Sequence, residues 1–135
     1  VKYGNPGFGH NGGNDCFIAS VDPFDGSLQG YSFYGGSGDE AGESIRFTSE
    51  NDIVFTGTTN GDFNTGIYGD PVKTAESEKI FVMKTDSAGG MLWYTFIGGT
   101  GSNTNHGTGI EVDSNNDIFI CEICNKMLVI FVIYT

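Results

Sequence analysis

The first candidate chemistry lies in turns rich in aspartate and asparagine. Asp22-Pro23-Phe24-Asp25-Gly26 and Asp113-Ser114-Asn115-Asn116-Asp117 each bring several side-chain oxygens close together, and Ca²⁺ prefers oxygen ligands. Neither segment matches the EF-hand calcium loop with its distal Glu. Asp and Asn also occupy turns for conformational reasons, because they hydrogen-bond their own backbone and tolerate positive φ. We expect conformational turns, with cation binding as the alternative, and predict no metal-ligating residue.

The cysteines invite a test for redox or zinc chemistry. Cys121-Glu122-Ile123-Cys124 has the C-x-x-C spacing, and Cys16 stands apart. A thioredoxin-like site would place this motif at the start of a helix within a βαβ unit, and no helical periodicity surrounds it. A zinc site needs further ligands, and His10 and His106 are each isolated. The sequence therefore predicts neither a redox nor a zinc role for these residues.

Two glycine-rich segments and one aromatic segment complete the candidates. Gly35-Gly36-Ser37-Gly38 and Gly98-Gly99-Thr100-Gly101 lack the Lys-Ser/Thr and the helix of a phosphate-binding loop, so we expect turns that end strands. Trp93, Tyr94 and Phe96 have faces that stack on sugar rings, but we expect them to pack in a core. The chain has no nucleophile elbow and no zinc-protease motif. We predict no catalytic residue, no cofactor-binding residue and no cofactor.

These segments recur along the chain. Tyr3-Gly4-Asn5-Pro6 returns as Tyr68-Gly69-Asp70-Pro71, an offset of 65 from residue 3 to residue 68. Three further pairs return in the same order at offsets of 63 to 65 residues: Phe17-Ile18-Ala19 as Phe81-Val82-Met83, Gly35-Gly36 as Gly98-Gly99, and Asn51-Asp52-Ile53 as Asn116-Asp117-Ile118. Such a period marks a solenoid, a propeller or an array, whose units bury their apolar faces against one another. We place unit 1 at about residues 3–67 and unit 2 at about residues 68–121.

Each unit reads as short β-strands separated by turns. Apolar and aromatic runs alternate with Asp, Asn, Pro and Gly, a pattern typical of hairpins. We expect a four-stranded antiparallel sheet over residues 44–97, with partial sheets at 17–34 and 108–121. The 22 glycines disfavour helices. The predicted fold class is all-β, a β-propeller fragment of about two blades of four-stranded antiparallel sheet.

The order of these segments resembles the bacterial β-propeller repeat called SBBP. A D-x-F-hydrophobic strand, an Asp/Gly turn and an aromatic strand ending in Gly-Gly lead to a V-D-S-x-N-x-hydrophobic hairpin. The best match is Gly107 to Ile120, and the resemblance covers about residues 12–121. The other matching segments are Asp15 to Val21, Tyr31 to Gly36, Phe81 to Lys84 and Trp93 to Gly99.

The resemblance implies a non-catalytic repeat segment of an extracellular or cell-surface protein. It would act as a scaffold or as a binding surface for a protein or carbohydrate ligand. The loops expected to take part are those at residues 60–77 and 101–107. The alternative is part of a propeller enzyme that acts on polysaccharide and needs further blades to complete its site. Fold alone does not decide between them.

Length and charge narrow the range of partners. The chain has 135 residues, too few for a closed propeller of at least four blades. We therefore expect a fragment of a longer parent chain, whose adjacent blades would pack against it. The net charge of −11 argues against nucleic acid. The apolar run near the end is far shorter than the ~20 residues of a membrane-spanning helix, so we expect no membrane insertion.

The end of the chain departs from the repeat. At an offset of 65, the residues after Cys121 should resemble the polar segment at 57–63, but residues 128–135 are almost wholly apolar. We predict that residues 1–121 hold the propeller repeats and that residues 122–135 form a divergent apolar tail foreign to them. A genuine final strand at the edge of the sheet is the alternative.

Overall fold

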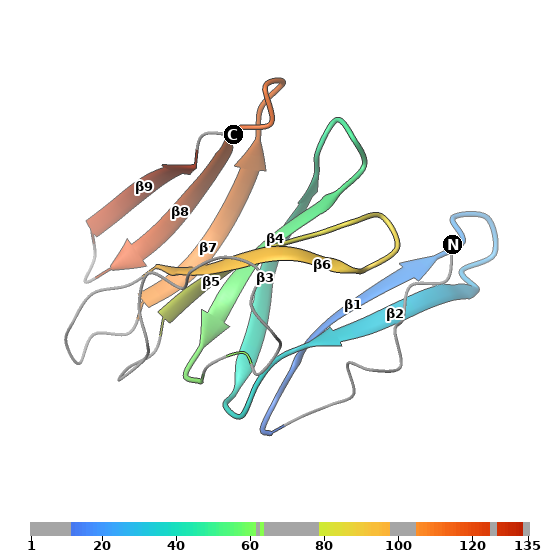
Figure 1. The fold of residues 1–135 in the computed structure, drawn as a ribbon, viewed down its shortest axis with the longest axis horizontal. Helices are drawn as coiled ribbons and strands as arrows, with labels where there is room; N and C mark the ends of the chain where they lie inside the picture. Colours follow the sequence, from blue (N-terminus) through green and yellow to red (C-terminus); the bar gives the residue numbers. More distant parts are fainter. Residues whose placement is uncertain (1–11, 62, 64–78, 98–104, 125–126, 134–135) are drawn as a thin grey trace.

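The structure, a computed structural model, describes residues 12–61, 63, 79–97, 105–124 and 127–133 (Figure 1). Alternating side chains and frequent turn residues make this part of the chain a succession of β-strands. Their bounds are β1 (Cys16–Val21), β2 (Leu28–Tyr34), β3 (Glu40–Phe47), β4 (Ile53–Thr59), β5 (Lys79–Thr85), β6 (Met91–Ile97), β7 (Asn105–Val112), β8 (Ile118–Cys124) and β9 (Met127–Ile133). Within these residues there is no helix that is long and apolar enough to cross a membrane.

The strands form three antiparallel sheets, each a simple meander. Sheet A contains β1 and β2, sheet B has the order β3-β4-β5-β6, and sheet C has the order β7-β8-β9. The all-β class and the four-stranded antiparallel sheet over residues 44–97 are therefore confirmed. The described strands contain one complete four-stranded sheet instead of about two, and they do not close into a ring (Figure 1).

The pairing of strands confirms the repeat between sheets A and B. Phe17 pairs with Phe33 in β1–β2, and Phe81 pairs with Phe96 in β5–β6. In both ladders the register shifts three to four residues after these phenylalanines. The shift lies between Ser20 and Val21 in β1 and between Lys84 and Thr85 in β5. The strand β1 is thus equivalent to β5, and β2 to β6.

The β3–β4 and β7–β8 hairpins are equivalent in the same way. Ile53 and Ile118 each begin the second strand of their hairpin, and both hairpins shift register at the corresponding position of the first strand. Their turns contain Asn51 and Asn116, with φ of 65° and 67°. This left-handed conformation is one that Asn adopts more readily than most residues. The predicted equivalence of Ile53 and Ile118 is confirmed.

The three sheets pack face to face, with sheet B in the middle (Figure 1). One apolar cluster joins sheets A and B, and a second joins sheets B and C. Every residue of β4 is buried, because alternate residues point into the two clusters. The first cluster contains Cys16, Tyr34, Ile53, Phe55, Phe63, Phe81, Met83, Tyr94 and Phe96. The second contains Val54, Ile80, Val82, Ile110, Ile118 and Ile120.

The apolar end of the chain takes the place of a repeat strand. β9 pairs along its whole length with β8, and Cys124 lies opposite Met127. In sheet B, Thr59 lies opposite Lys79 at the equivalent point of β4 and β5. β9 therefore has the register of β5, although its sequence differs. The boundary predicted after residue 121 falls inside β8, and residues 127–133 form β9 at the edge of sheet C. That residues 122–135 are foreign to the propeller repeats stays a prediction.

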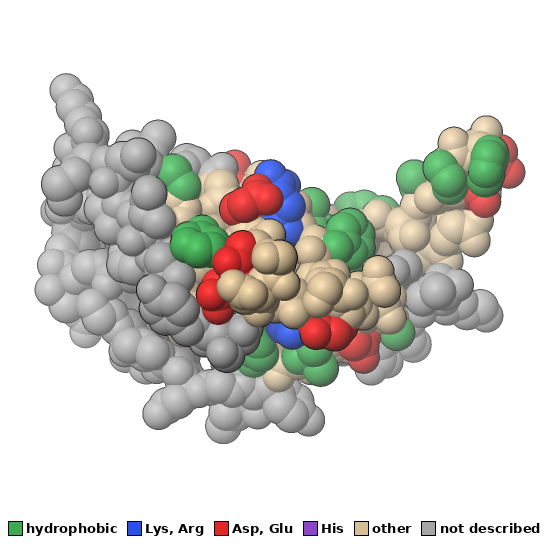
Figure 2. Space-filling view, turned by 90° about the horizontal axis from the view of Figure 1, so that it is seen from above, with side chains coloured by type: hydrophobic (Ala, Val, Ile, Leu, Met, Phe, Trp, Pro, Cys, Tyr) green, Lys and Arg blue, Asp and Glu red, His purple; other side chains and the backbone are tan. Residues whose placement is uncertain are grey.

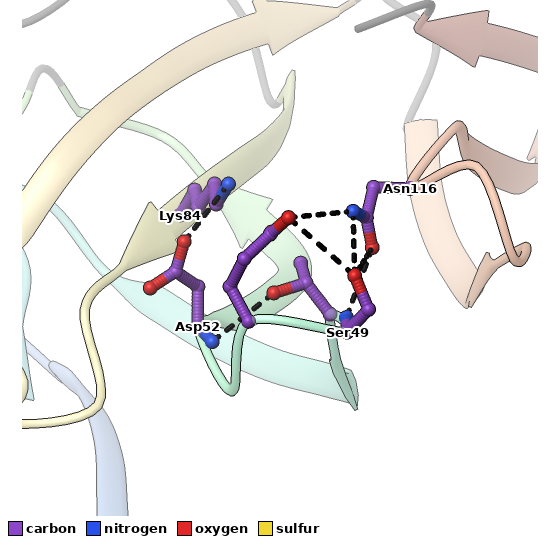
Figure 3. Close-up of polar contacts among 6 residues, drawn as sticks. Ser49, Asp52, Lys84 and Asn116 are labelled. Carbon is purple, nitrogen blue, oxygen red and sulfur yellow. Dashed lines mark hydrogen bonds and ion pairs between the residues drawn. The ribbon is translucent and has the colours of Figure 1, made fainter.

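Polar contacts join equivalent turns of successive units (Figure 3). The Ser49 backbone N–H donates to Asn116 Oδ1 at 2.9 Å, and Asn116 Nδ2 donates to Glu50 Oε1 at 3.1 Å. Arg46 Nε also lies 3.0 Å from Glu111 Oε2. Arg46 and Glu111 are separated by 65 residues and so occupy the same position of the repeat. These bonds fix the hairpins of sheets B and C beside each other.

Candidate functional site: a groove beside β1

The aspartates of the predicted turns hold the backbone. Asp22 Oδ1 accepts the Phe24 N–H at 2.8 Å, and Asp113 Oδ1 accepts the Asn115 N–H at 2.9 Å. The hydrogen bond from the Ser27 backbone is the main cause that lowers the pKa of Asp25. Among the described residues, no three His, Cys, Asp or Glu side chains form a group that could hold a metal. The geometry favours the conformational interpretation of these turns.

The cysteines lie in strands. Cys16 is buried in β1, and burial, followed by the charges of Glu40 and Asp15, raises the pKa of its thiol to about 12. It is therefore protonated near neutral pH and a poor nucleophile. Cys121 is half-buried on β8. Cys124 ends the same strand, and its side chain lies outside the described residues, so the C-x-x-C spacing stays a question of sequence.

At the first glycine pair, Gly35 and Gly36, the backbone lies close to two carboxylates. A Cβ on Gly35 would meet a carboxylate oxygen of Asp15 and lie 2.6 Å from Glu40 Oε2. The Gly36 N–H donates to Glu40 Oε2 at 2.8 Å. Two carboxylates occupy the space that a phosphate would need, so Gly35 and Gly36 serve as a turn. The second pair, Gly98 and Gly99, lies outside the described residues.

Most of the aromatic candidates are in the core. Tyr94 and Phe96 are buried in the cluster between sheets A and B, and their ring centroids are 5.5 Å apart. Trp93 is partly buried against the cluster between sheets B and C. The predicted core packing is thus confirmed for Tyr94 and Phe96. Outside the described residues lie His10, residues 62, 64–77 and 101–104 of the predicted binding loops, and the side chains of residues 105–107, including His106.

A buried glutamate, Glu40, connects the segment before β1 with β4 of sheet B, a role that the sequence did not reveal. Glu40 is 3 % exposed. Its Oε1 accepts the Thr59 hydroxyl at 2.6 Å, and its backbone N–H donates to the Asn14 carbonyl at 2.6 Å. Such hydrogen bonds offset the cost of burying a carboxylate. The only sequence signal is its position directly after a Gly-Ser-Gly-Asp turn, where an edge strand begins.

The described residues form a groove between sheets A and B. Its volume is about 300 Å³, and it is lined by residues 16–19 of β1, 42–45 of β3 and 55–56 of β4. The polar side chains in its wall are Glu43, Ser44 and Thr56, and the remainder is mainly apolar. Ile45 is 40 % exposed at this groove. The lining suits an apolar side chain or an extended peptide better than a reaction.

The outer face of sheet A is also apolar. Phe17, Tyr31 and Phe33 contact one another, with ring centroids 5.2 to 6.0 Å apart. Phe17 is 53 % exposed, whereas its equivalent Phe81 is fully buried. The hairpin turn that joins β1 and β2 projects from the molecule, with hydrophobic and acidic side chains at its tip (the lobe at the right of Figure 2). Sheet A thus exposes a face that sheet B buries.

No protein-family model matches this sequence, and no curated protein matches it. The resemblance to the SBBP repeat therefore stays a prediction from the residues.

Proposed function

We propose that this chain is a non-catalytic β-propeller repeat segment of the SBBP type, which acts as a scaffold or binding surface. The observation that carries the proposal is the repeated pairing scheme. Equivalent strands share register shifts and turn conformations, and the middle sheet is buried on both faces. A unit that packs on a neighbour at each face is suited to an array or a ring of sheets.

Several of the described side chains that could react have structural roles, which favours binding over catalysis. Asp22, Asp86 and Asp113 hold turns, and Glu40 is bonded inside the molecule. Cys16 is buried as a thiol. A glycosidase would need two carboxylates on either side of an open site, whereas the groove wall holds Glu43 as its one carboxylate.

The proposed setting is extracellular or on a cell surface, with protein or carbohydrate as the ligand class. The formal net charge of −11 supports this by disfavouring nucleic acid. Exposed aromatic side chains on sheet A, such as Tyr31 at 47 %, supply flat surfaces of the kind that protein and sugar ligands contact.

A binding screen paired with a turnover assay tests the proposal. The full chain is applied to an array of bacterial and plant polysaccharides and cell-surface proteins, and the same preparation is incubated with each polysaccharide. We expect saturable binding to at least one ligand and no release of reducing ends or unsaturated products above a heat-denatured control. Turnover in proportion to protein concentration would overturn the non-catalytic assignment.

A second test concerns the propeller itself. The parent reading frame should encode further units of about 65 residues, and its structure should show successive four-stranded sheets around an axis. A parent whose sheets form a two-layer sandwich would refute the proposed architecture.

A further inference from the structure

The segment directly after β4 contains an asparagine followed by a glycine, Asn60-Gly61. In such a pair the backbone nitrogen of the glycine can attack the carboxamide of the asparagine, because glycine has no Cβ to hinder the close approach. Asn60 is exposed, so solvent water has access to its side chain. The groups around this pair are those that would assist the attack.

A relay of two hydrogen bonds contacts the nitrogen that would attack. The Gly61 N–H donates to Thr59 Oγ1 at 3.0 Å, and the Thr59 hydroxyl donates to Glu40 Oε1 at 2.6 Å. The Gly61 carbonyl is the other acceptor near this hydroxyl, at 3.0 Å, so the shorter bond goes to the carboxylate. Thr59 and Glu40 are 1 % and 3 % exposed. A buried carboxylate that draws a proton from a nucleophile through a hydroxyl activates that nucleophile.

The carboxamide that would be attacked is polarised and held in place. The Asp39 N–H donates to Asn60 Oδ1 at 2.7 Å, and negative charge develops on this oxygen when a nitrogen adds to the carbon. Asn60 Nδ2 donates to Asp39 Oδ2 at 3.4 Å. A Cβ on Gly38 would meet Asn60 Oδ1 and lie 2.6 Å from the Gly61 nitrogen. The carboxamide and the nitrogen therefore lie beside each other against Gly38.

We propose that Asn60 is a site of spontaneous deamidation that the fold accelerates. The Gly61 nitrogen forms a bond to Asn60 Cγ as its proton passes to Thr59 Oγ1, whose own proton passes to Glu40. The bond from Cγ to Nδ2 breaks, and the nitrogen takes a proton from water and leaves as ammonia. The hydroxide so formed takes the proton from Glu40. A second water opens the succinimide to aspartate or isoaspartate, and this chemistry does not depend on the proposed scaffold function.

The modification changes the connection between sheets A and B. Gly38 and Asp39 lie in the linker from β2 to β3, and the Asn60 N–H donates to the Asp39 carbonyl at 3.3 Å. Deamidation replaces the Nδ2 donor by an oxygen, so two carboxylates face each other where a donor faced an acceptor, and like charges in contact are destabilising. Isoaspartate also lengthens the main chain by one carbon beside Gly38, where a Cβ has no room. The product should loosen the linker from the end of β4.

The rate of deamidation in the native and unfolded states tests the acceleration. The full chain is incubated near neutral pH, and peptide mapping by mass spectrometry follows the mass change and the isoaspartate at position 60. The reference rates are those of the chain unfolded in urea and of a synthetic peptide of residues 57–63. Native Asn60 should react about tenfold faster or more than in both references. The other Asn-Gly pair, Asn11-Gly12, is followed in the same digests as an internal reference.

Variants at Thr59 and Glu40 test the relay. Thr59→Val removes the hydroxyl and should lower the rate at Asn60 to that of the peptide, whereas Thr59→Ser keeps the hydroxyl and should retain most of the acceleration. The matched control, Thr58→Val, changes the neighbouring buried threonine and should leave the rate unchanged. Glu40→Gln keeps an acceptor oxygen but cannot take the proton. It should slow the reaction and reduce the ratio of rates in ordinary and heavy water, which a purely structural role would not change.

Two outcomes would overturn the inference: a native rate at or below that of the unfolded chain, or wild-type rates in both Thr59→Val and Glu40→Gln. If Thr59→Val does not fold, the comparison of native with unfolded chain and the Glu40→Gln isotope ratio decide. Ion exchange separates the aged protein, which carries one more negative charge, from the fresh protein. The isoaspartate form should unfold at a lower urea concentration, and an unchanged midpoint would refute the loosening of the linker.

Discussion

Comparing Phe81→Ala with Phe17→Ala separates the effect of the position in the repeat from the effect of burial by a neighbouring sheet. The two residues have the same type and equivalent pairing. Phe81 is fully buried, with ring centroids 5.9 Å from Phe55 and 5.2 Å from Phe63. A Phe→Ala change at such a site lowers the free energy of unfolding by ~3–5 kcal/mol. Phe17 is 53 % exposed, so about half of its surface stays in water in the folded state. Its replacement by alanine should therefore lower the free energy of unfolding by about 1 kcal/mol.

Urea unfolding followed by the fluorescence of the single tryptophan, Trp93, measures both values. It is carried out at low protein concentration so that association does not contribute. If Phe81→Ala fails to fold, Phe81→Leu and Phe17→Leu give the same comparison with smaller losses. Equal losses at the two positions would refute the assignment of the buried face to sheet B and the exposed face to sheet A.

Three further predictions concern turns, a thiol and an ion pair. Asn51 and Asn116 have φ of 65° and 67°, so Asn51→Gly should change the free energy of unfolding by less than about 0.5 kcal/mol. Asn116→Gly should cost about 1 kcal/mol in the same urea assay, because it also removes the bonds to the β3–β4 turn. The pKa of the Cys16 thiol is raised from 9.0 to about 12, so between these pH values the folded state retains a proton that the unfolded state loses. The free energy of unfolding is therefore unaffected by this thiol below about pH 9. It should fall by up to ~1.4 kcal/mol per pH unit as the pH rises toward 12. Urea titrations at pH 8 and pH 10 should show a smaller drop for Cys16→Ala. Lys84 Nζ lies 3.0 Å from Asp52 Oδ2, with side chains 18 % and 21 % exposed, and a double-mutant cycle should give a coupling of about 1 kcal/mol that weakens in high salt.

Local chemistry made the strands and turns predictable. Asp, Asn and Gly recur at fixed offsets because the turns need side-chain acceptors or positive φ, as at Asp113 and Asn116. The alternation of apolar residues at Ile45 and Phe47 indicates which residues of that strand share a face. The order of strands and the equivalence of the two units could therefore be derived before any coordinates.

Burial and the fate of the chain end could not be derived in the same way. Phe17 and Phe81 have similar sequence surroundings, and only the neighbouring sheet makes one exposed and the other buried. Glu40 reads as a surface residue, but a long-range bond to Thr59 makes it an internal one. β9 shares no motif with β5, and backbone pairing accepts any strand-forming run at an open edge. These outcomes depend on contacts between units, which a repeat pattern does not encode.

The ion pair between Arg46 and Glu111 has a consequence for the order in which units can stand. The two side chains come from the same position of successive units and lie 3.0 Å apart. Two identical units in this arrangement would bring arginine to arginine or glutamate to glutamate, and like charges in contact are destabilising. Divergence at this position removes that repulsion, which amounts to no more than about 1 kcal/mol because both side chains are largely exposed. The opposite charges at this position favour packing of these two hairpins beside each other and disfavour packing of a unit against an identical one.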